Sequence, residues 1–293
     1  MVGRGHVAED GGLTPMTTVA TPITIDAFGV TDKGKVRPAN EDHFVVADIR
    51  RSVEMMHGSL PSDVLVNSIG STTAYLFAVA DGVGGGPDGD LASERTAAAV
   101  LSYVSGTAMC FNGLDVDREH ELLQSLENTV QKVHQELVST VAPNVKAPAT
   151  TLTLVLLLWP RAYLIHVGDS RAYVRRRGRV QAMTRDQTFG EYMISVGAWS
   201  EDQAGKFRTA ETLASAIGGS EMIRTVGLID LEPGDSLLLC TDGLTKHVPE
   251  ERITEVLGQS ADSKTMAETL LGDALNAGGS DNISIIVARG VNS

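Results

Sequence analysis

The feature that most constrains this sequence is one stretch, Phe77–Gly86, which reads FAVADGVGGG. The apolar run predicts a buried strand that stops at a single carboxylate, Asp81, and glycines follow at once. Because glycine has no Cβ, the Asp81 side chain and the Gly82 carbonyl can reach one ligand together. Asp-Gly is also an ordinary turn signal, so this stretch alone does not separate a ligand site from a turn.

Three similar acidic signals occur elsewhere, each beside a run that predicts a buried strand. They are Asn40-Glu41-Asp42, Asp242-Gly243 after LLLCT, and Asp281-Asn282 before ISIIVA. If these strands share one sheet edge, the carboxylates converge, and two bare carboxylates about 4 Å apart repel by roughly 4 kcal/mol at an effective dielectric near 20. Oxygen ligands favour Mg²⁺ or Mn²⁺, and no H-x-x-x-H or C-x-x-C pair competes. The pattern therefore predicts a centre for hard divalent cations, with four separate solvated aspartates as the alternative.

Two hard cations that share a carboxylate form a hydrolytic centre, because they lower the pKa of a bridging water and neutralise a phosphoryl group. Arg37 stands four residues before Glu41 and is the candidate phosphate ligand. A guanidinium matches two phosphate oxygens at once, which is the reason for this assignment. A solvated surface arginine is the alternative.

Composition excludes several classes of protein. The net charge of −13 over 293 residues argues against non-specific nucleic-acid binding and against attachment to an anionic membrane surface. Leu152–Trp159 is the most apolar segment and is too short to span a bilayer, and the N-terminus lacks the apolar region of a signal peptide. The two cysteines form no disulfide framework, and Cys240 within LLLC is predicted to be a core residue. A cytoplasmic location is expected.

Hydrophobic periodicity predicts an antiparallel α+β protein or a layered sandwich, because helices and strands come in blocks and not as strict βαβ units. Residues 1–22 are predicted to be a flexible tail, and residues 23–293 a single domain. That domain carries an insertion at about 50–71 and a surface excursion at about 187–210. Predicted helices are 91–104, 120–140, 250–257 and 264–275, and predicted strands are 23–30, 44–48, 75–80, 150–159, 162–167, 171–175, 236–240 and 283–288. The three strands at 150–159, 162–167 and 171–175, of which the last two are separated by the turn Gly168-Asp169-Ser170, are predicted to form a hairpin or meander.

Six motifs in order resemble those of the metal-dependent Ser/Thr protein phosphatases of type 2C, in their bacterial form. They span about Ile25 to Arg289 and read GKVRPANED, VADGVGGG, HVGDSRAY, MTRDQ, LEPGDSLLLCTDGLT and GGSDNIS. One such motif is weak, whereas six in order are highly specific. The resemblance implies an α+β fold in which two antiparallel sheets, flanked by helices, form a four-layer αββα sandwich with the metals at one edge.

The same resemblance implies the ligands of two Mn²⁺ or Mg²⁺ ions. By position, Asp81 matches the carboxylate that bridges both ions, and Gly82 offers its carbonyl. Asp242 and Asp281 match the remaining ligands of the first ion. A metal-bridging hydroxide would then attack phosphorus directly, without a phosphoenzyme.

The remaining site residues are also matched by position. Glu41 and Asp42 resemble the pair that holds the ligands and waters of the second ion, and Arg37 matches the phosphate-binding arginine. Asp169 matches a residue that can join a third, weaker ion, with a hairpin-turn aspartate as the alternative.

Two of the departures from the family pattern bear on the chemistry of the site. Val83 stands where some relatives carry a histidine proposed as general acid, so protonation of the leaving group would fall to a metal-bound water. Lys246, four residues after Asp242, stands where the family often has Asp, which weakens the case for a third ion. The excursion at about 187–210 corresponds to the variable flap that would meet protein substrates.

The sequence thus predicts a protein serine/threonine phosphatase that hydrolyses phosphoserine and phosphothreonine. Its expected partners are phosphorylated Ser/Thr proteins, including a partner Ser/Thr kinase or its substrates, with no nucleic acid and no membrane. A catalytically weak, phosphatase-fold regulatory binding protein and a phosphatase for small phosphomonoesters are the alternatives. The complete set of mutually repelling acids argues against the first, and the lack of an enclosing pocket signature argues against the second.

Overall fold

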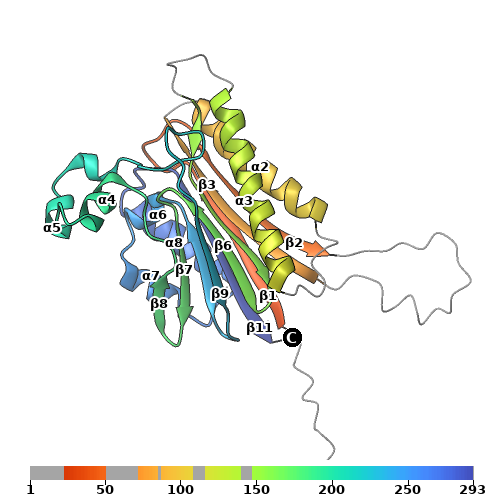
Figure 1. The fold of residues 1–293 in the computed structure, drawn as a ribbon. Helices are drawn as coiled ribbons and strands as arrows, with labels where there is room; N and C mark the ends of the chain where they lie inside the picture. Colours follow the sequence, from red (N-terminus) through yellow and green to blue (C-terminus); the bar gives the residue numbers. More distant parts are fainter. Residues whose placement is uncertain (1–22, 51–71, 85–86, 108–115, 140–146, 293) are drawn as a thin grey trace, which may run out of the picture.

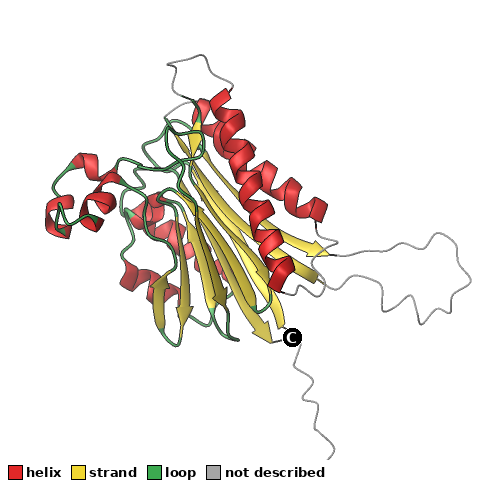
Figure 2. Ribbon diagram, in the orientation of Figure 1, coloured by secondary structure: helices red, strands yellow, loops and turns green. Residues whose placement is uncertain are grey.

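The computed structural model describes residues 23–50, 72–84, 87–107, 116–139 and 147–292. The predicted tail and nearly all of the predicted insertion lie outside these ranges. Within them, the strands form two antiparallel sheets, with the orders β1-β11-β10-β7-β8 and β2-β3-β5-β6-β9. We call these sheet A and sheet B. Figure 1 shows how helices cover the sheets on opposite sides of the molecule, and Figure 2 shows the same arrangement by element type. The predicted four-layer α+β sandwich is confirmed.

The strands and helices have the following bounds. Sheet A contains β1 (Ile23–Asp32), β7 (Arg171–Arg176), β8 (Arg179–Ala182), β10 (Ser236–Cys240) and β11 (Ile283–Asn292). Sheet B contains β2 (Asp42–Arg50), β3 (Thr72–Val83), β5 (Leu152–Leu158), β6 (Arg161–Val167) and β9 (Thr225–Asp230), and β4 (Ala149–Thr150) pairs with β3. The helices are α2 (Pro87–Thr107), α3 (Val116–Ser139), α4 (Phe189–Ser195), α5 (Glu201–Ala204), the 3₁₀ helix η2 (Arg208–Glu211), α6 (Asp242–Thr245), α7 (Glu250–Leu257) and α8 (Ser263–Asn276).

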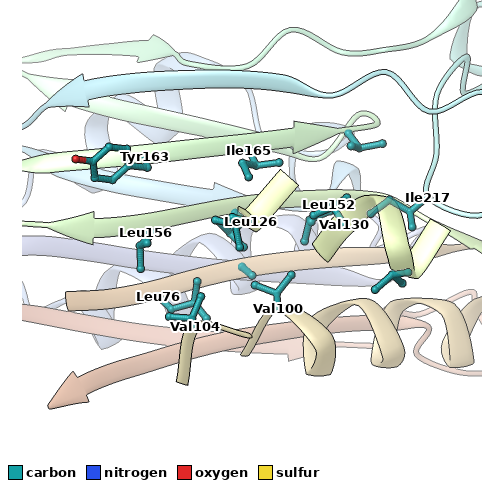
Figure 3. Packing of buried hydrophobic residues seen from close by; sticks show 14 of the residues in the cluster. Leu76, Val100, Val104, Leu126, Val130, Leu152, Leu156, Tyr163, Ile165 and Ile217 are labelled. Atoms are coloured by element: carbon teal, nitrogen blue, oxygen red, sulfur yellow. The ribbon is translucent and has the colours of Figure 1, made fainter. Parts of the chain in front are cut away.

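The core has three layers, because both faces of each sheet are covered. In β3 the alternation of a strand sends Leu76 and Ala78 toward α2 and α3, and Phe77 and Val79 toward sheet A. Figure 3 shows the first of these layers, between sheet B and the two helices. A third layer lies between sheet A and helices α7 and α8. Strands buried on both faces read as continuous apolar runs, which explains LLLC and LTLVLLL.

Helix α3 has the periodicity that the sequence predicts. Its residues at intervals of three and four are buried against sheet B and α2, and they are Leu122, Leu126, Val130, Val133 and Leu137. Cys240 is fully buried, as predicted for a core residue. In the described part of the chain, no helix combines the length and the apolar character needed to cross a bilayer.

The strand predictions are partly wrong. The predicted hairpin or meander is confirmed for β5 and β6, which pair with each other, but it does not continue into β7, because β7 pairs with β10 and β8 in sheet A. The connection at Gly168 therefore crosses between the sheets. The run predicted as one strand at 150–159 is divided into β4 and β5. β8 and β9 were not predicted, since β9 is mostly exposed and contains Gly227, which weakens its strand signal.

Candidate active site

A pocket of about 300 Å³ lies where the end of β3, the start of α6 and the start of β11 meet. β3 continues through Asp81 and Gly82 to Val83, so Asp81 lies inside the strand and not at its end as predicted. Seven of the eight predicted site residues line this pocket, namely Arg37, Glu41, Asp81, Gly82, Asp169, Asp242 and Asp281. The eighth, Asp42, is buried beside it.

Asp42 and Asp81 face each other directly across β2 and β3. Side chains of opposed residues in antiparallel strands come within about 5 Å of each other at Cβ, and like charges there are destabilising. Asp42 is 4% exposed, and its Oδ2 accepts a hydrogen bond from Thr241 Oγ1 at 2.8 Å. Burial raises the pKa of Asp42 to about 7. Burial, together with the charge of Asp42 and other carboxylates, also raises the pKa of Asp81.

Asp242 and Asp281 lie against two basic side chains. Lys246 Nζ is 2.5 Å from Asp242 Oδ2 and 2.8 Å from Asp281 Oδ2, and Arg37 Nε is 2.6 Å from Asp281 Oδ1. Burial raises the pKa of the Asp281 carboxyl, but hydrogen bonds from Arg37 and Lys246 outweigh it and hold this pKa below its usual value. Burial also raises the pKa of Asp242, and there the neighbouring lysine opposes the shift without reversing it.

Two glycines allow the backbone segments of the site to approach closely. A Cβ on Gly82 would lie 2.5 Å from the carbonyl carbon of Gly89, in the first turn of α2. A Cβ on Gly243 would collide with the carbonyl oxygen of Asn282, which brings the start of α6 against the start of β11. The glycine after each acid therefore has a steric role in bringing Asp81 and Asp242 into one pocket.

Hydroxyl groups fix the backbone of Asp81. Its N–H donates to Thr151 Oγ1 at 3.0 Å, and its carbonyl accepts from Thr150 Oγ1 at 2.8 Å. Thr151 Oγ1 also shares a hydrogen bond of 2.8 Å with Ser170 Oγ, next to Asp169. Burial, followed by the charge of Asp242, raises the pKa of Asp169 to about 7. This buried chain connects Asp81 to the segment between β6 and β7 that carries Asp169.

Asn282 holds the loop that carries Arg37. Its side-chain oxygen accepts from Glu41 N–H at 2.9 Å, and its side-chain nitrogen donates to the carbonyls of Lys33 and Ala39 at 2.9 and 2.8 Å. The loop from Lys33 to Glu41 is thereby fixed beside Asp281. The Glu41 carboxylate packs against Gly89 at the start of α2.

The excursion after residue 187 is a closed loop beside the pocket. An isolated β-bridge pairs Thr188 with Leu213 at its base, and Phe189 N–H donates to the carbonyl of Thr212. Between them, α4, α5 and η2 project beyond the sheets (Figure 1). The Trp199 ring packs edge-on against Phe189, with ring centroids 5.5 Å apart, and stacks on Phe207 at 4.8 Å. We call this loop, residues 188–213, the flap.

Sequence reasoning missed the hydroxyl groups and the two ion pairs of Lys246. One signal was present, since Thr150 and Thr151 are polar residues at the start of an otherwise apolar run. Thr241 gave a similar signal, directly after LLLC. The contact of Lys246 with Asp281 had no local signal, because the two residues are 35 positions apart.

The donor atoms fit a hard divalent cation, although no ready-made cage is present. Within the described residues, no group of three or more His, Cys, Asp or Glu side chains is arranged to hold a metal ion. Asp281 is instead engaged on both oxygens by cationic side chains. The buried atoms Asp42 Oδ1 and Asp242 Oδ1 have no hydrogen-bond partner. Unpaired carboxylate oxygens are costly when buried, and hard cations are their usual partners.

Comparison with known proteins identifies the family. The family model for protein phosphatase 2C matches residues 56–276. The chain belongs to the protein phosphatase 2C family. The family resemblance drawn from the six motifs is therefore confirmed.

Individual members of the family differ in how much of their length this chain spans. The serine/threonine protein phosphatase PstP of Mycobacterium tuberculosis is 33% identical over 217 residues, which cover 73% of this chain and 40% of PstP. The serine/threonine phosphatase stp of Listeria monocytogenes is 26% identical over 263 residues, which cover 88% of this chain and 93% of stp. A crystal structure of the catalytic domain of PstP in complex with two manganese ions superposes with a TM-score of 0.70 at 29% identity, and covers 92% of this chain and 100% of that domain.

Proposed function

We propose that this protein is a metal-dependent phosphatase that hydrolyses phosphoserine and phosphothreonine in proteins. The observation that supports this most directly is the convergence of Asp81, Asp242 and Asp281 on one pocket that also contains Arg37. Separate solvated aspartates, the alternative for these acids, would not share a pocket or shift each other's pKa. The PstP catalytic domain with two manganese ions is a relative of the same fold, which supports a cation site here.

Five of the acidic residues have a role in this proposal. Asp81, Asp242 and Asp281 would hold one Mn²⁺ or Mg²⁺ ion, and Asp81 with the Gly82 carbonyl would hold the other. Glu41 and Asp42 would orient the water around the second ion. When bound, such a pair of cations lowers the pKa of a water and neutralises charge on the phosphoryl group.

Arg37 is the proposed phosphate ligand. Its side chain is 48% exposed at the pocket and already holds the Asp281 carboxylate through Nε and Nη2. A phosphate has the same fork of oxygens as a carboxylate, so the guanidinium is oriented for the exchange before substrate arrives. The described lining of the pocket includes no Cys, Ser or His, which favours direct hydrolysis over transfer to one of these side chains.

Protein substrates would meet the flap. Its residues Glu211, Thr212 and Leu213 form part of the pocket wall, so a chain that carries the phosphate would pass over them. We infer that the partners are phosphorylated Ser/Thr proteins, including a Ser/Thr kinase or its substrates, in the cytoplasm. A small phosphomonoester is too short to contact the flap outside the pocket. In a competition assay, a phosphopeptide is therefore expected to be hydrolysed in preference to a small phosphomonoester.

The test is release of phosphate from a phosphothreonine peptide during titration with Mn²⁺. The wild type is expected to need Mn²⁺ and to lose turnover in EDTA. Asp81→Asn and Asp242→Asn are expected to lose activity by about a thousandfold or more, because each removes a carboxylate that would hold a cation. The matched control is Asp262→Asn, far from the pocket, where Asn can still cap α8 and activity should be unchanged. Wild-type turnover that persists in EDTA would contradict the proposal.

One observation favours the alternative of a catalytically weak regulatory binding protein. Lys246 bridges two of the proposed metal ligands, and an ammonium there opposes cation binding. Calorimetry separates the two functions. Mn²⁺ binding at millimolar concentration or tighter, together with turnover, supports the enzyme, whereas absence of both supports the binding protein.

A further inference from the structure

Lys246 occupies an unusual position for a basic residue in this pocket. It follows the last residue of α6, and its backbone N–H donates to the carbonyl of Asp242, one turn earlier. This turn directs the side chain back over the acids. The ammonium then contacts Asp242 Oδ2 at 2.5 Å and Asp281 Oδ2 at 2.8 Å. One cation thus joins two carboxylates from segments that are distant in sequence.

Lys246 engages the two carboxylates, Asp242 and Asp281, that would help to hold the first divalent ion. Asp242 has a second oxygen, Oδ1, which is buried without a hydrogen-bond partner. The lysine therefore satisfies one oxygen of Asp242 and leaves the other open. A single positive charge offsets the repulsion between two carboxylates less fully than two charges do. The charges of Asp242 and Asp281 are therefore only partly neutralised by Lys246, and binding of a divalent cation there remains favourable.

We propose that Lys246 is a tethered competitor for the first divalent cation, and that it sets the concentration of free cation at which the Asp242–Asp281 position fills. The ion would need carboxylate oxygens that the ammonium occupies, so it would bind there only after the lysine leaves. This inference rests on the proposed metal-dependent function and names a regulatory element of the same site.

The Lys246 side chain is able to move away from Asp242 and Asp281 into solvent. Its side chain is 35% exposed, so a path to solvent exists without movement of the sheets. A lysine ammonium is strongly hydrated and sits on a flexible four-carbon chain, which lowers the cost of withdrawing it into water. Asp281 keeps its contact with Arg37 when this happens, and Asp242 becomes free on both oxygens.

The competition acts on one part of the pocket. Asp42 and Asp81 pair across β2 and β3, and the Asp42 carboxylate accepts a hydrogen bond from the Thr241 hydroxyl. A cation at Asp81 and Gly82 therefore displaces no ammonium. Two cations are expected to bind in two steps, with the weaker step at Asp242 and Asp281.

The experiment is calorimetric titration of the metal-free protein with Mn²⁺ in the absence of substrate. Wild type is compared with Lys246→Met, which keeps the length but removes the charge, and with Lys246→Arg, which keeps the charge. The control is Lys264→Met, whose ammonium lies 3.8 Å from Glu268 on α8. Lys246→Met should tighten the weaker step by about tenfold or more, within the usual range of coupling between two ligands. Lys246→Arg and Lys264→Met should leave it within about threefold of wild type, in keeping with context effects of that size.

Two further measurements keep the outcome decisive. Lys246→Gln removes the charge but keeps a hydrogen-bond donor, and it replaces Lys246→Met if that variant fails to fold. The shift in melting temperature on adding Mn²⁺ should be larger in either neutral variant than in wild type. Unchanged or weaker Mn²⁺ binding in a folded neutral variant would overturn the competition, even if wild type hydrolyses phosphopeptides. Tighter binding without any turnover would instead overturn the proposed function and leave the competition standing.

Discussion

The two halves of the acidic pocket neutralise their carboxylates in different ways. In the strand half, Asp42 and Asp81 face each other across β2 and β3, with hydroxyl and backbone groups around them. In the basic half, Asp242 and Asp281 hold Lys246, and Arg37 holds Asp281 as well. The pKa values reflect this difference, since burial raises the pKa of Asp42 to about 7 whereas ion pairs keep the pKa of Asp281 low.

The comparison shows that burial and ion pairing act separately on the carboxylates of one site. In the strand half, Asp42 and Asp81 repel each other when both are charged, and binding of a proton or a divalent cation reduces this repulsion. The basic half carries its own cations and is less dependent on an added one. The cation at Asp81 and Gly82 is therefore expected to bind before the cation at Asp242 and Asp281.

The largest expected effect comes from breaking the geometry of the strand half. Gly82→Ala places a Cβ 2.5 Å from the Gly89 carbonyl carbon, and backbone cannot move aside as a flexible side chain can. We expect a loss of about 3 kcal/mol in the free energy of unfolding, together with loss of activity. Urea denaturation measures the first and phosphopeptide turnover the second.

The control for this variant is Gly272→Ala in α8, where an added Cβ meets nothing within 4 Å. It should raise stability by about 0.5–1 kcal/mol, because alanine is the better helix former. A Gly82→Ala protein as stable as wild type would show that α2 is free to shift away from β3.

The next effect is the pH dependence of the metal-free protein. The raised pKa of Asp42 means that the folded protein binds more protons than the unfolded chain between about pH 4 and pH 7. Stability should therefore fall as the pH rises through this window, by about 2 kcal/mol between pH 5 and pH 8. Denaturation in EDTA at a series of pH values measures it, and Asp42→Asn should make the fall smaller, while the raised pKa values of Asp81 and Asp169 maintain part of it.

Within the basic half, Asp281 predicts the opposite sign at lower pH, whereas the raised pKa of Asp242 acts in the same direction as that of Asp42. Because the pKa of Asp281 is lowered in the folded state, its contribution is present above about pH 4 and is lost as the pH falls further. Stability of the metal-free protein that rises steadily from pH 5 to pH 8 would contradict the uncompensated state of Asp42.

A smaller effect on stability should come from removing a hydroxyl group that holds the backbone of Asp81 in the strand half. Thr151→Val removes the acceptor for the Asp81 N–H and the partner of Ser170 Oγ while keeping the shape. We expect a loss of about 1.5 kcal/mol in stability, the usual cost of leaving buried polar groups unpaired. Thr269→Val is the matched control, because its hydroxyl bonds a carbonyl of its own helix. Equal effects in the two variants would show that Thr151 has no special role at the site.

The smallest and most discriminating effect is a difference in sign between two conservative variants. In EDTA at pH 8, Asp81→Asn should stabilise the protein by about 1 kcal/mol, because it removes a charge directly opposite Asp42. Asp281→Asn should destabilise it by about 1 kcal/mol, because Arg37 and Lys246 lose their charged partner. Shifts of the same sign in both variants would remove the distinction between the two halves.

Much of the fold was predictable from periodicity. The stripe in α3 and the apolar runs of β5 and β10 follow directly from burial on one or both faces. The predicted hairpin of β5 and β6 is confirmed, but its continuation into β7 was wrong, because a turn signal at Gly168 is compatible with pairing and with a crossing between sheets. β9 escaped prediction, since its residues are mostly exposed at the edge of sheet B.

The candidate site divides along similar lines. Convergence of the acids on one pocket was predictable, because each acid is adjacent to a strand that had to be buried. Carboxylates that repel each other are brought together where a cation can offset the repulsion. The partners of those acids were not predictable. Thr151 lies 70 residues from Asp81, and Thr241 lies 199 residues from Asp42.

The sequence by itself determined which residues could bind a hard cation and which strands would carry them, because composition, spacing and hydrophobic period are local properties. Only the tertiary structure decided how the charges are paired. Arg37 reaches Asp281 across 244 positions of chain, and Lys246 reaches the same carboxylate from α6. The reason is physical, since the energy of an ion pair depends on the distance and burial of its two ends, and the packing of the two sheets sets both.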